Sequence, residues 1–158
     1  METNRYMNTK HVPDLELCQE FDTLCKEKNI TIPETEFYWD AVAGGSIEIV
    51  KAPSASSNIT NKERCHDELS NISIPAPLVS EQGEWLPWIL AGVDIGGDVN
   101  VSIEFQKVAD KHGVMYVENN ETLASFKDGF VEQWDTTESN ARQKMINYLI
   151  AEGIITNL

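Results

Sequence analysis

The chain has 158 residues, 41% hydrophobic and 24% charged, so it can bury a core as one domain without disulfide staples. Twelve basic residues face 26 acidic ones, and the net charge of −14 disfavours non-specific binding to DNA or RNA, because phosphates bind clusters of Lys and Arg. We find neither a charged-then-apolar leader nor an apolar run of 18 residues, so we expect no signal peptide, no membrane span and a cytoplasmic location.

The first part of the chain predicts a loose arm followed by a helix. Residues 1–12 are polar and form the expected flexible N-terminal arm. A helix over 14–28 is then expected, with Asp14 as its N-cap and Asn29 as its left-handed stop. Apolar residues recur at intervals of three and four, which is one helical stripe: Leu17, Cys18, Phe21, Leu24 and Cys25.

The cysteines are expected to be structural. Their number, three, is odd, which argues against a disulfide framework. Cys18 and Cys25 are seven residues apart on the predicted helix, about 10 Å along its axis. That separation is too long for a disulfide bond, so we expect two small buried hydrophobic side chains.

A hairpin is predicted near 35–51, because aromatic and β-branched residues flank the pair Gly44-Gly45. Phe37 and Trp39 would share one face of its first strand. The stretch near 52–62 is small and polar, and we expect a flexible loop there.

A short helix is expected to begin at Ser80, which is a good N-cap residue. Glu81 and Glu84 fall in its first turn, where the helix dipole favours acidic side chains. Pro87 limits this helix to about two turns.

A second hairpin is predicted near 99–118. Apolar residues alternate with polar ones along its first strand, so one face should be buried: Val99, Val101, Ile103 and Phe105. A further helix is expected over 121–134, with an apolar stripe made by Leu123, Phe126, Phe130 and Trp134.

The last predicted element is a helix over 137–152, capped by Thr136 or Thr137 and stopped by Gly153. Helices at both ends with antiparallel hairpins between them indicate a single α+β domain over 13–158.

The chain holds no catalytic or metal-binding motif. None of His11, His66 and His112 has a second ligand at zinc spacing, and neither a nucleophile elbow nor a P-loop occurs. We therefore expect no cofactor and no metal. An enzyme with an unrecognised acid/base site, for example around Asp40, His66 or Asp94, stays open as an alternative.

Aromatic residues are the better functional lead. The chain has four tryptophans, among which Trp85 and Trp88 are three residues apart and could lie on one face. Tryptophan and tyrosine combine a large apolar body with a polar tip, which suits interfaces and flat ligands. Core packing is the alternative for these rings.

Four stretches, in this order, resemble a largely uncharacterised family of small proteins from bacteriophage and prophage genomes: VPDLELC, ETEFYW, PAPLVSEQGEWLP and SNARQKMINYLIAEGI. They cover about a quarter of the chain. The resemblance implies a setting, the infected host cell, and no catalytic residues. The segment WLPWILAGVDIGGDVNVSIEF, with GVMYVEN and ASFKDGFVEQW after it, is similar to the SUKH superfamily of immunity and interaction proteins.

In that setting we expect a non-enzymatic binding protein that serves counter-defence. It would sequester a nucleotide-like immune signal or block a host protein, and a homo-oligomer stays open. A signal-binding pocket needs cations for phosphates and a ring for the base, which suggests six residues: Tyr38, Trp39, Trp85, Trp88, Arg142 and Lys144. The alternative from the second similarity is an immunity-type module whose acidic surface covers a basic partner.

Overall fold

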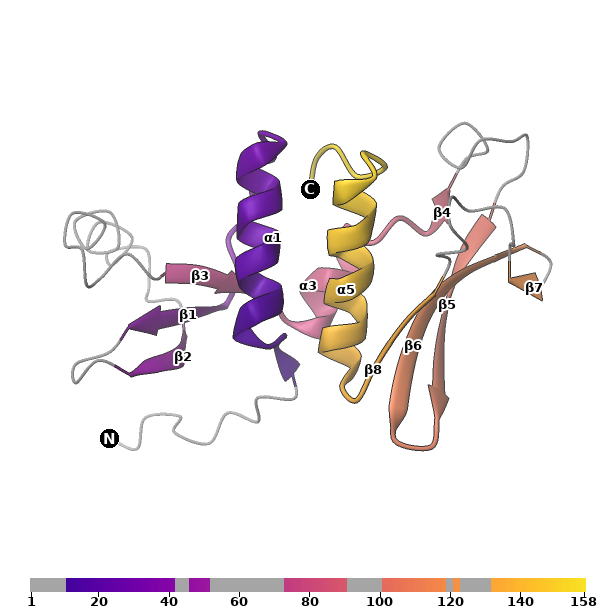
Figure 1. Ribbon diagram of the computed structural model, residues 1–158, viewed down its shortest axis with the longest axis horizontal. Coiled ribbons are helices and arrows are strands. Elements are labelled where there is room, and N and C mark those ends of the chain that lie inside the picture. The colour runs from indigo at the N-terminus through magenta and orange to yellow at the C-terminus, as the bar shows by residue number, and fades with distance from the viewer. Residues whose placement is uncertain (1–10, 42–45, 52–72, 91–100, 119–120, 123–131) are drawn as a thin grey trace.

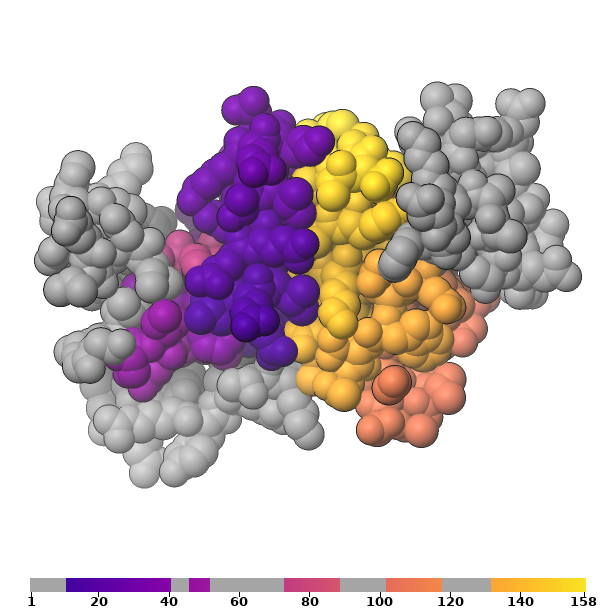
Figure 2. Space-filling view, viewed as in Figure 1, coloured from indigo at the N-terminus to yellow at the C-terminus, as the bar shows by residue number. Residues whose placement is uncertain are grey.

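The structure is a computed structural model that describes residues 11–41, 46–51, 73–90, 101–118, 121–122 and 132–158. Within these ranges, helices pack between two antiparallel sheets, which confirms the α+β class. Helices α1 (Leu15–Glu27) and α5 (Glu138–Ala151) lie side by side in the centre, with one sheet beyond each of them and α3 (Val79–Trp85) behind (Figure 1). The two helices also make up the middle of the face in Figure 2.

Both predicted terminal helices are present, and their ends follow the local signals. Helix α1 spans Leu15–Glu27 with Asp14 in the N-cap position, and Asn29 takes the left-handed conformation with a φ of 56°. The Asp14 carboxylate makes no capping hydrogen bond, because it accepts instead from the side chain of Asn140 at 2.8 Å. Helix α5 spans Glu138–Ala151, and the hydroxyl of Thr137 accepts a hydrogen bond from the backbone N–H of Asn140 at 3.2 Å. Gly153 has a φ of 74°, where a side chain would be strained.

The first sheet contains the predicted hairpin near 35–51. Strands β1 (Phe37–Ala41), β2 (Ile47–Lys51) and β3 (Ser73–Ala76) pair antiparallel in the order β2-β1-β3. Phe37 and Trp39 share the face that packs under α1, as the alternation predicts.

A small core joins this sheet to α1. Its buried members are Val12, Cys18, Phe37, Ile74 and Ala76. Val12 is only 1% exposed, so the last residue of the predicted arm belongs to the packed part of the chain. Residues 1–10 and the predicted loop near 52–62 lie outside the described ranges.

The second sheet contains the predicted hairpin near 99–118. Its strands are β4 (Ile89–Leu90), β5 (Val101–Val108), β6 (Lys111–Glu118), β7 (Glu121–Thr122) and β8 (Glu132–Asp135). Strand β6 is central, because it pairs with β5 on one side and with β7 and β8 on the other.

The helix predicted over 121–134 is wrong at both ends, which are strands β7 and β8. The residues between them, 123–131, lie outside the described ranges. Strand pairing outweighs the helical spacing at Trp134, because its ring covers Gly113 on β6. A Cβ at Gly113 would lie 2.7 Å from that ring, so the glycine makes the contact possible.

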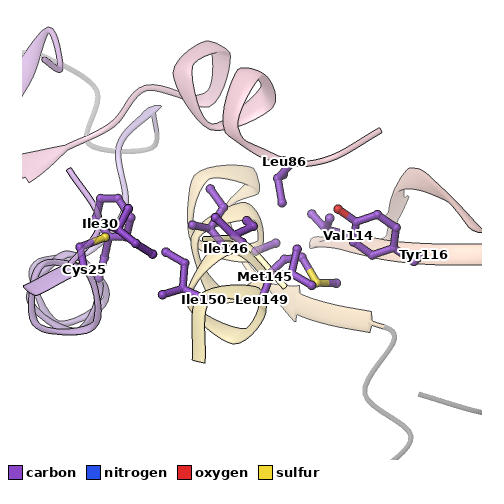
Figure 3. Close-up of a cluster of buried hydrophobic side chains, with 12 residues drawn as sticks. Cys25, Ile30, Leu86, Val114, Tyr116, Met145, Ile146, Leu149 and Ile150 are labelled. Atoms are coloured by element: carbon purple, nitrogen blue, oxygen red, sulfur yellow. The ribbon is translucent and has the colours of Figure 1, made fainter. Parts of the chain in front are cut away.

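The larger core lies between α5, β6 and the end of α3. Figure 3 shows side chains from α5 meeting Leu86, Val114 and Tyr116 on one side and α1 on the other. Helix α5 therefore contacts neighbours on several sides, and nine of its residues are buried.

Buried polar side chains on α5 bond one another and the neighbouring helices. Gln82 of α3 donates to the side-chain oxygen of Gln143 at 3.0 Å, and Gln143 donates to Asn147 at 2.8 Å. Asn147 then donates to Glu20 of α1 at 2.9 Å. Because unpaired buried amides are costly, this chain of hydrogen bonds fixes how α3, α5 and α1 pack.

Candidate functional site

Helix α3 (Val79–Trp85) forms one wall of the candidate site. It begins two residues before the predicted start, with Leu78 in the N-cap position in place of Ser80. The carboxylate of Glu81 explains this difference, because one oxygen accepts the N–H of Leu78 at 2.6 Å and the other that of Glu36 at 3.0 Å. A carboxylate thus caps the helix where a hydroxyl was expected.

The segment after α3 is fixed by hydrogen bonds to two of its backbone carbonyls. The buried hydroxyl of Tyr116 donates to the carbonyl of Pro87 at 2.8 Å, and the N–H of Ile103 donates to the carbonyl of Trp88 at 3.0 Å. Burial raises the pKa of Tyr116 above its ordinary value, which keeps the hydroxyl protonated as a donor. The Trp88 side chain is nevertheless 70% exposed.

A cavity of about 430 Å³ opens between α3 and β5, with Trp88 at its rim. Its lining is mostly apolar: Val79, Ser80, Gly83, Glu84, Leu86, Trp88, Ile103, Phe105 and Arg142. This volume falls in the range of small-ligand and side-chain pockets. The cavity can therefore take a bulky apolar group.

Arg142 of α5 supplies the positive charge in this lining. Its Nε and Nη2 donate to one oxygen of Glu138 at 3.0 and 2.6 Å, and its Nη1 donates to the carbonyl of Val79 at 3.1 Å. The guanidinium also lies over the Phe105 ring, 4.1 Å from the ring centre. With its side chain 13% exposed, Arg142 is both held in place and paired.

Gly83 is the residue that lets the guanidinium approach α3. A Cβ at this position would lie 2.8 Å from Nη1 of Arg142. A glycine inside a helix costs up to about 1 kcal/mol relative to alanine. That cost is offset by the room it leaves for the arginine.

The structure brings together two of the six predicted site residues, Trp88 and Arg142. Trp85 does not share a face with Trp88. Its ring stacks on Phe21, with ring centres 5.6 Å apart, and packs against the larger core. The three-residue spacing fails here because α3 ends at Trp85, so the helical geometry does not extend to Trp88.

The other three predicted site residues lie elsewhere. Trp39 packs in the small core, and its indole N–H donates to the carbonyl of Pro13 at 3.1 Å. Tyr38 is half-buried on the opposite face of β1. Lys144 pairs with Asp135 at 2.6 Å and does not line the cavity.

Sequence reasoning missed the contributions of Phe105 and Gly83. Phe105 was predicted on a buried face, but it is 38% exposed and lines the cavity. The available signal was Gly83, because a glycine inside a short helix suggests a close approach by another group.

The two cysteine thiols in the described part of the chain are poor nucleophiles. Burial raises the pKa of Cys18 to about 12 and that of Cys25 to about 11, so both stay protonated at neutral pH. Both are buried and free, as predicted. The described residues contain no cluster of three His, Cys, Asp or Glu side chains suited to a metal ion.

Of the three alternative acid/base residues, the structure describes Asp40 alone. Asp40 is buried on β1, while His66 and Asp94 lie outside the described ranges.

Within the described part of the chain, none of the helices combines the length and apolar character that crossing a membrane requires.

Comparison with known proteins finds no matching family model, no match among curated proteins and no match among solved structures.

Proposed function

We propose that this chain is a non-enzymatic binding protein that captures a segment of a partner protein in the cavity between α3 and β5. Trp88 carries the proposal, because its backbone is fixed on both sides while its ring is 70% exposed. Burying such a ring contributes about 2–3 kcal/mol. A fixed backbone lowers the ordering cost of that contact, which is how binding anchors are preorganised.

Charge supports a basic partner. The chain carries a net charge of −14, and Glu84 is exposed in the cavity lining. The positive charge of Arg142 is offset by Glu138. A bulky apolar side chain next to Lys or Arg would therefore fit both the cavity and its rim.

A nucleotide-like signal is a poorer fit than a protein. Phosphates need several cations, and among the described lining residues Arg142 is the one cation, already engaged by a carboxylate. In the setting that the phage resemblance implies, the partner would be a host protein met in the cytoplasm. An immunity-type module would use the same acidic, aromatic surface against a toxin.

A displayed library of random peptides tests this proposal. We expect enrichment of sequences with one bulky apolar residue beside Lys or Arg, and binding that weakens as salt rises. Trp88→Ala should abolish enrichment. Val108→Ala is the matched control, because Val108 is an exposed hydrophobic residue at the end of β5 that does not line the cavity.

The proposal fails if no peptide is enriched, or if Trp88→Ala enriches the same peptides as the wild type. Strong thermal stabilisation by a nucleotide would support the sequestering function in its place.

A further inference from the structure

Arg142 has unused capacity for hydrogen bonds at the cavity. A guanidinium carries five N–H donors. Three of them are engaged by Glu138 and Val79, which leaves two, one on each terminal nitrogen, without a partner in the described part of the chain. The side chain lines the cavity while only 13% exposed, so an acceptor that reaches it would be largely shielded from water.

We propose that Arg142 determines what the cavity accepts by donating to a neutral carbonyl oxygen beside the apolar group that fills it. This inference rests on the proposed function. The occupant would be a partner peptide, whose backbone places a carbonyl next to every side chain. The arginine would then distinguish a peptide from a purely apolar molecule of the same shape.

Charge decides between a neutral carbonyl and a carboxylate. Glu138 already places a negative charge 2.6 Å from Nη2, and Glu84 adds a second carboxylate in the lining. A ligand carboxylate would meet both, whereas an amide carbonyl adds no net charge. The pair of Arg142 and Glu138 therefore favours a neutral acceptor.

The orientation of the guanidinium is set by groups on three elements. Phe105 of β5 lies under its plane, Glu138 of α5 holds its edge, and Gly83 of α3 leaves room for Nη1. Because its donors are fixed before a ligand arrives, little freedom is lost when a carbonyl binds.

Three probes with the same ring test this assignment. They are 3-methylindole, which has no carbonyl, indole-3-acetamide, which has a neutral one, and indole-3-acetate, which has a carboxylate. Each would be titrated into the labelled protein while the NMR signals of the Arg142 Nε–H and the Trp88 indole N–H are followed.

We expect the amide to bind the wild type about tenfold more tightly than 3-methylindole and to shift the Arg142 signal. The carboxylate should bind no more tightly than the amide. Gly83→Ala should remove the advantage of the amide, because its Cβ displaces the guanidinium.

Glu138→Gln should shift the preference toward the carboxylate, since it uncovers the positive charge of Arg142. Lys144→Met is the matched control. It removes another ion-paired cation of α5 that does not line the cavity, and it should leave all three affinities unchanged.

Equal affinity of the wild type for 3-methylindole and the amide would overturn the role of Arg142 and leave the proposed function standing. A wild-type preference for the carboxylate would also overturn it, in favour of an anion site. If none of the probes shifts the Trp88 signal at millimolar concentration, both the assignment and the proposed function are wrong.

Discussion

Trp39 lies on β1, the central strand of the first sheet, and Trp88 directly precedes β4 of the second sheet. The two tryptophan side chains have opposite environments. Trp39 packs under α1, and its indole N–H bonds the carbonyl of Pro13. Trp88 has its backbone bonded to Tyr116 through Pro87 and to Ile103, while its ring is left 70% exposed. Stability explains the first ring and does not explain the second.

The comparison separates an aromatic residue that builds the fold from one that, in the proposed function, contacts a partner. A half-buried ring whose N–H already has an acceptor needs no partner outside the chain. An exposed ring on a fixed backbone, beside an apolar cavity, gains its packing only when something binds. Substitutions at the two positions should therefore affect different measurements.

The largest effect is expected at Trp39. Trp39→Ala should lower the free energy of unfolding by about 3 kcal/mol, because it opens the small core between α1 and the first sheet. Chemical denaturation measures this loss. A change below about 0.5 kcal/mol, the level of an ordinary surface substitution, would remove the contrast with Trp88.

Gly113 tests the second sheet. Gly113→Ala should cost about 2 kcal/mol, because the new Cβ would lie 2.7 Å from the Trp134 ring and push β8 from β6. Slower amide exchange in β8 than in the wild type would contradict this, since it would mean that the strand pairing had tightened. Gly153→Ala should destabilise for a different reason. Nothing lies within 4 Å of a Cβ at this position, so its cost would come from the positive φ of 74° alone.

Tyr116 links the two kinds of region, since its ring is in the core and its hydroxyl holds the segment of Trp88. Tyr116→Phe should cost about 1 kcal/mol of stability. It should also weaken binding of an enriched peptide by about threefold, because Trp88 loses one of its two backbone anchors. Chemical denaturation measures the stability, and titration of the same sample with the peptide measures the affinity. An unchanged peptide affinity would show that this anchor does not preorganise the Trp88 ring.

The smallest effect is expected on the stability of the protein at acidic pH. Burial alone would raise the pKa of Asp135, but hydrogen bonds from Lys144, Thr136 and Asn140 outweigh it and hold the pKa below 3.8. A lowered folded-state pKa contributes stability above the unfolded pKa and loses it as pH falls through the folded value. The free energy of unfolding should therefore fall less in Lys144→Met than in the wild type between neutral pH and a pH below 3.8. Chemical denaturation at the two pH values measures this difference.

Local signals explain why much of the fold could be predicted. The stripe on α1, the caps at Thr137 and Gly153, and the two hairpins all depend on residues close in sequence. Strand β8 could not be predicted in this way, because its pairing with β6 depends on the contact between Trp134 and Gly113.

The candidate site was predicted only in part, for the same reason. Trp88 and Arg142 were chosen by residue type, which does not reveal which aromatics and cations meet. Arg142 contacts Val79, 63 residues away, and Phe105 on a strand between them in sequence. The offset of its charge by Glu138 is different, because the two residues are four apart on α5 and their pairing is a local signal that sequence reasoning did not use.

One paired measurement tests the central claim most directly: the affinity for an enriched peptide and the free energy of unfolding, in Trp88→Ala and Val108→Ala. We predict that Trp88→Ala weakens binding by about thirtyfold and changes stability by less than about 0.5 kcal/mol, while Val108→Ala changes neither. Unchanged affinity in Trp88→Ala, or a loss of stability as large as that of Trp39→Ala, would contradict the account.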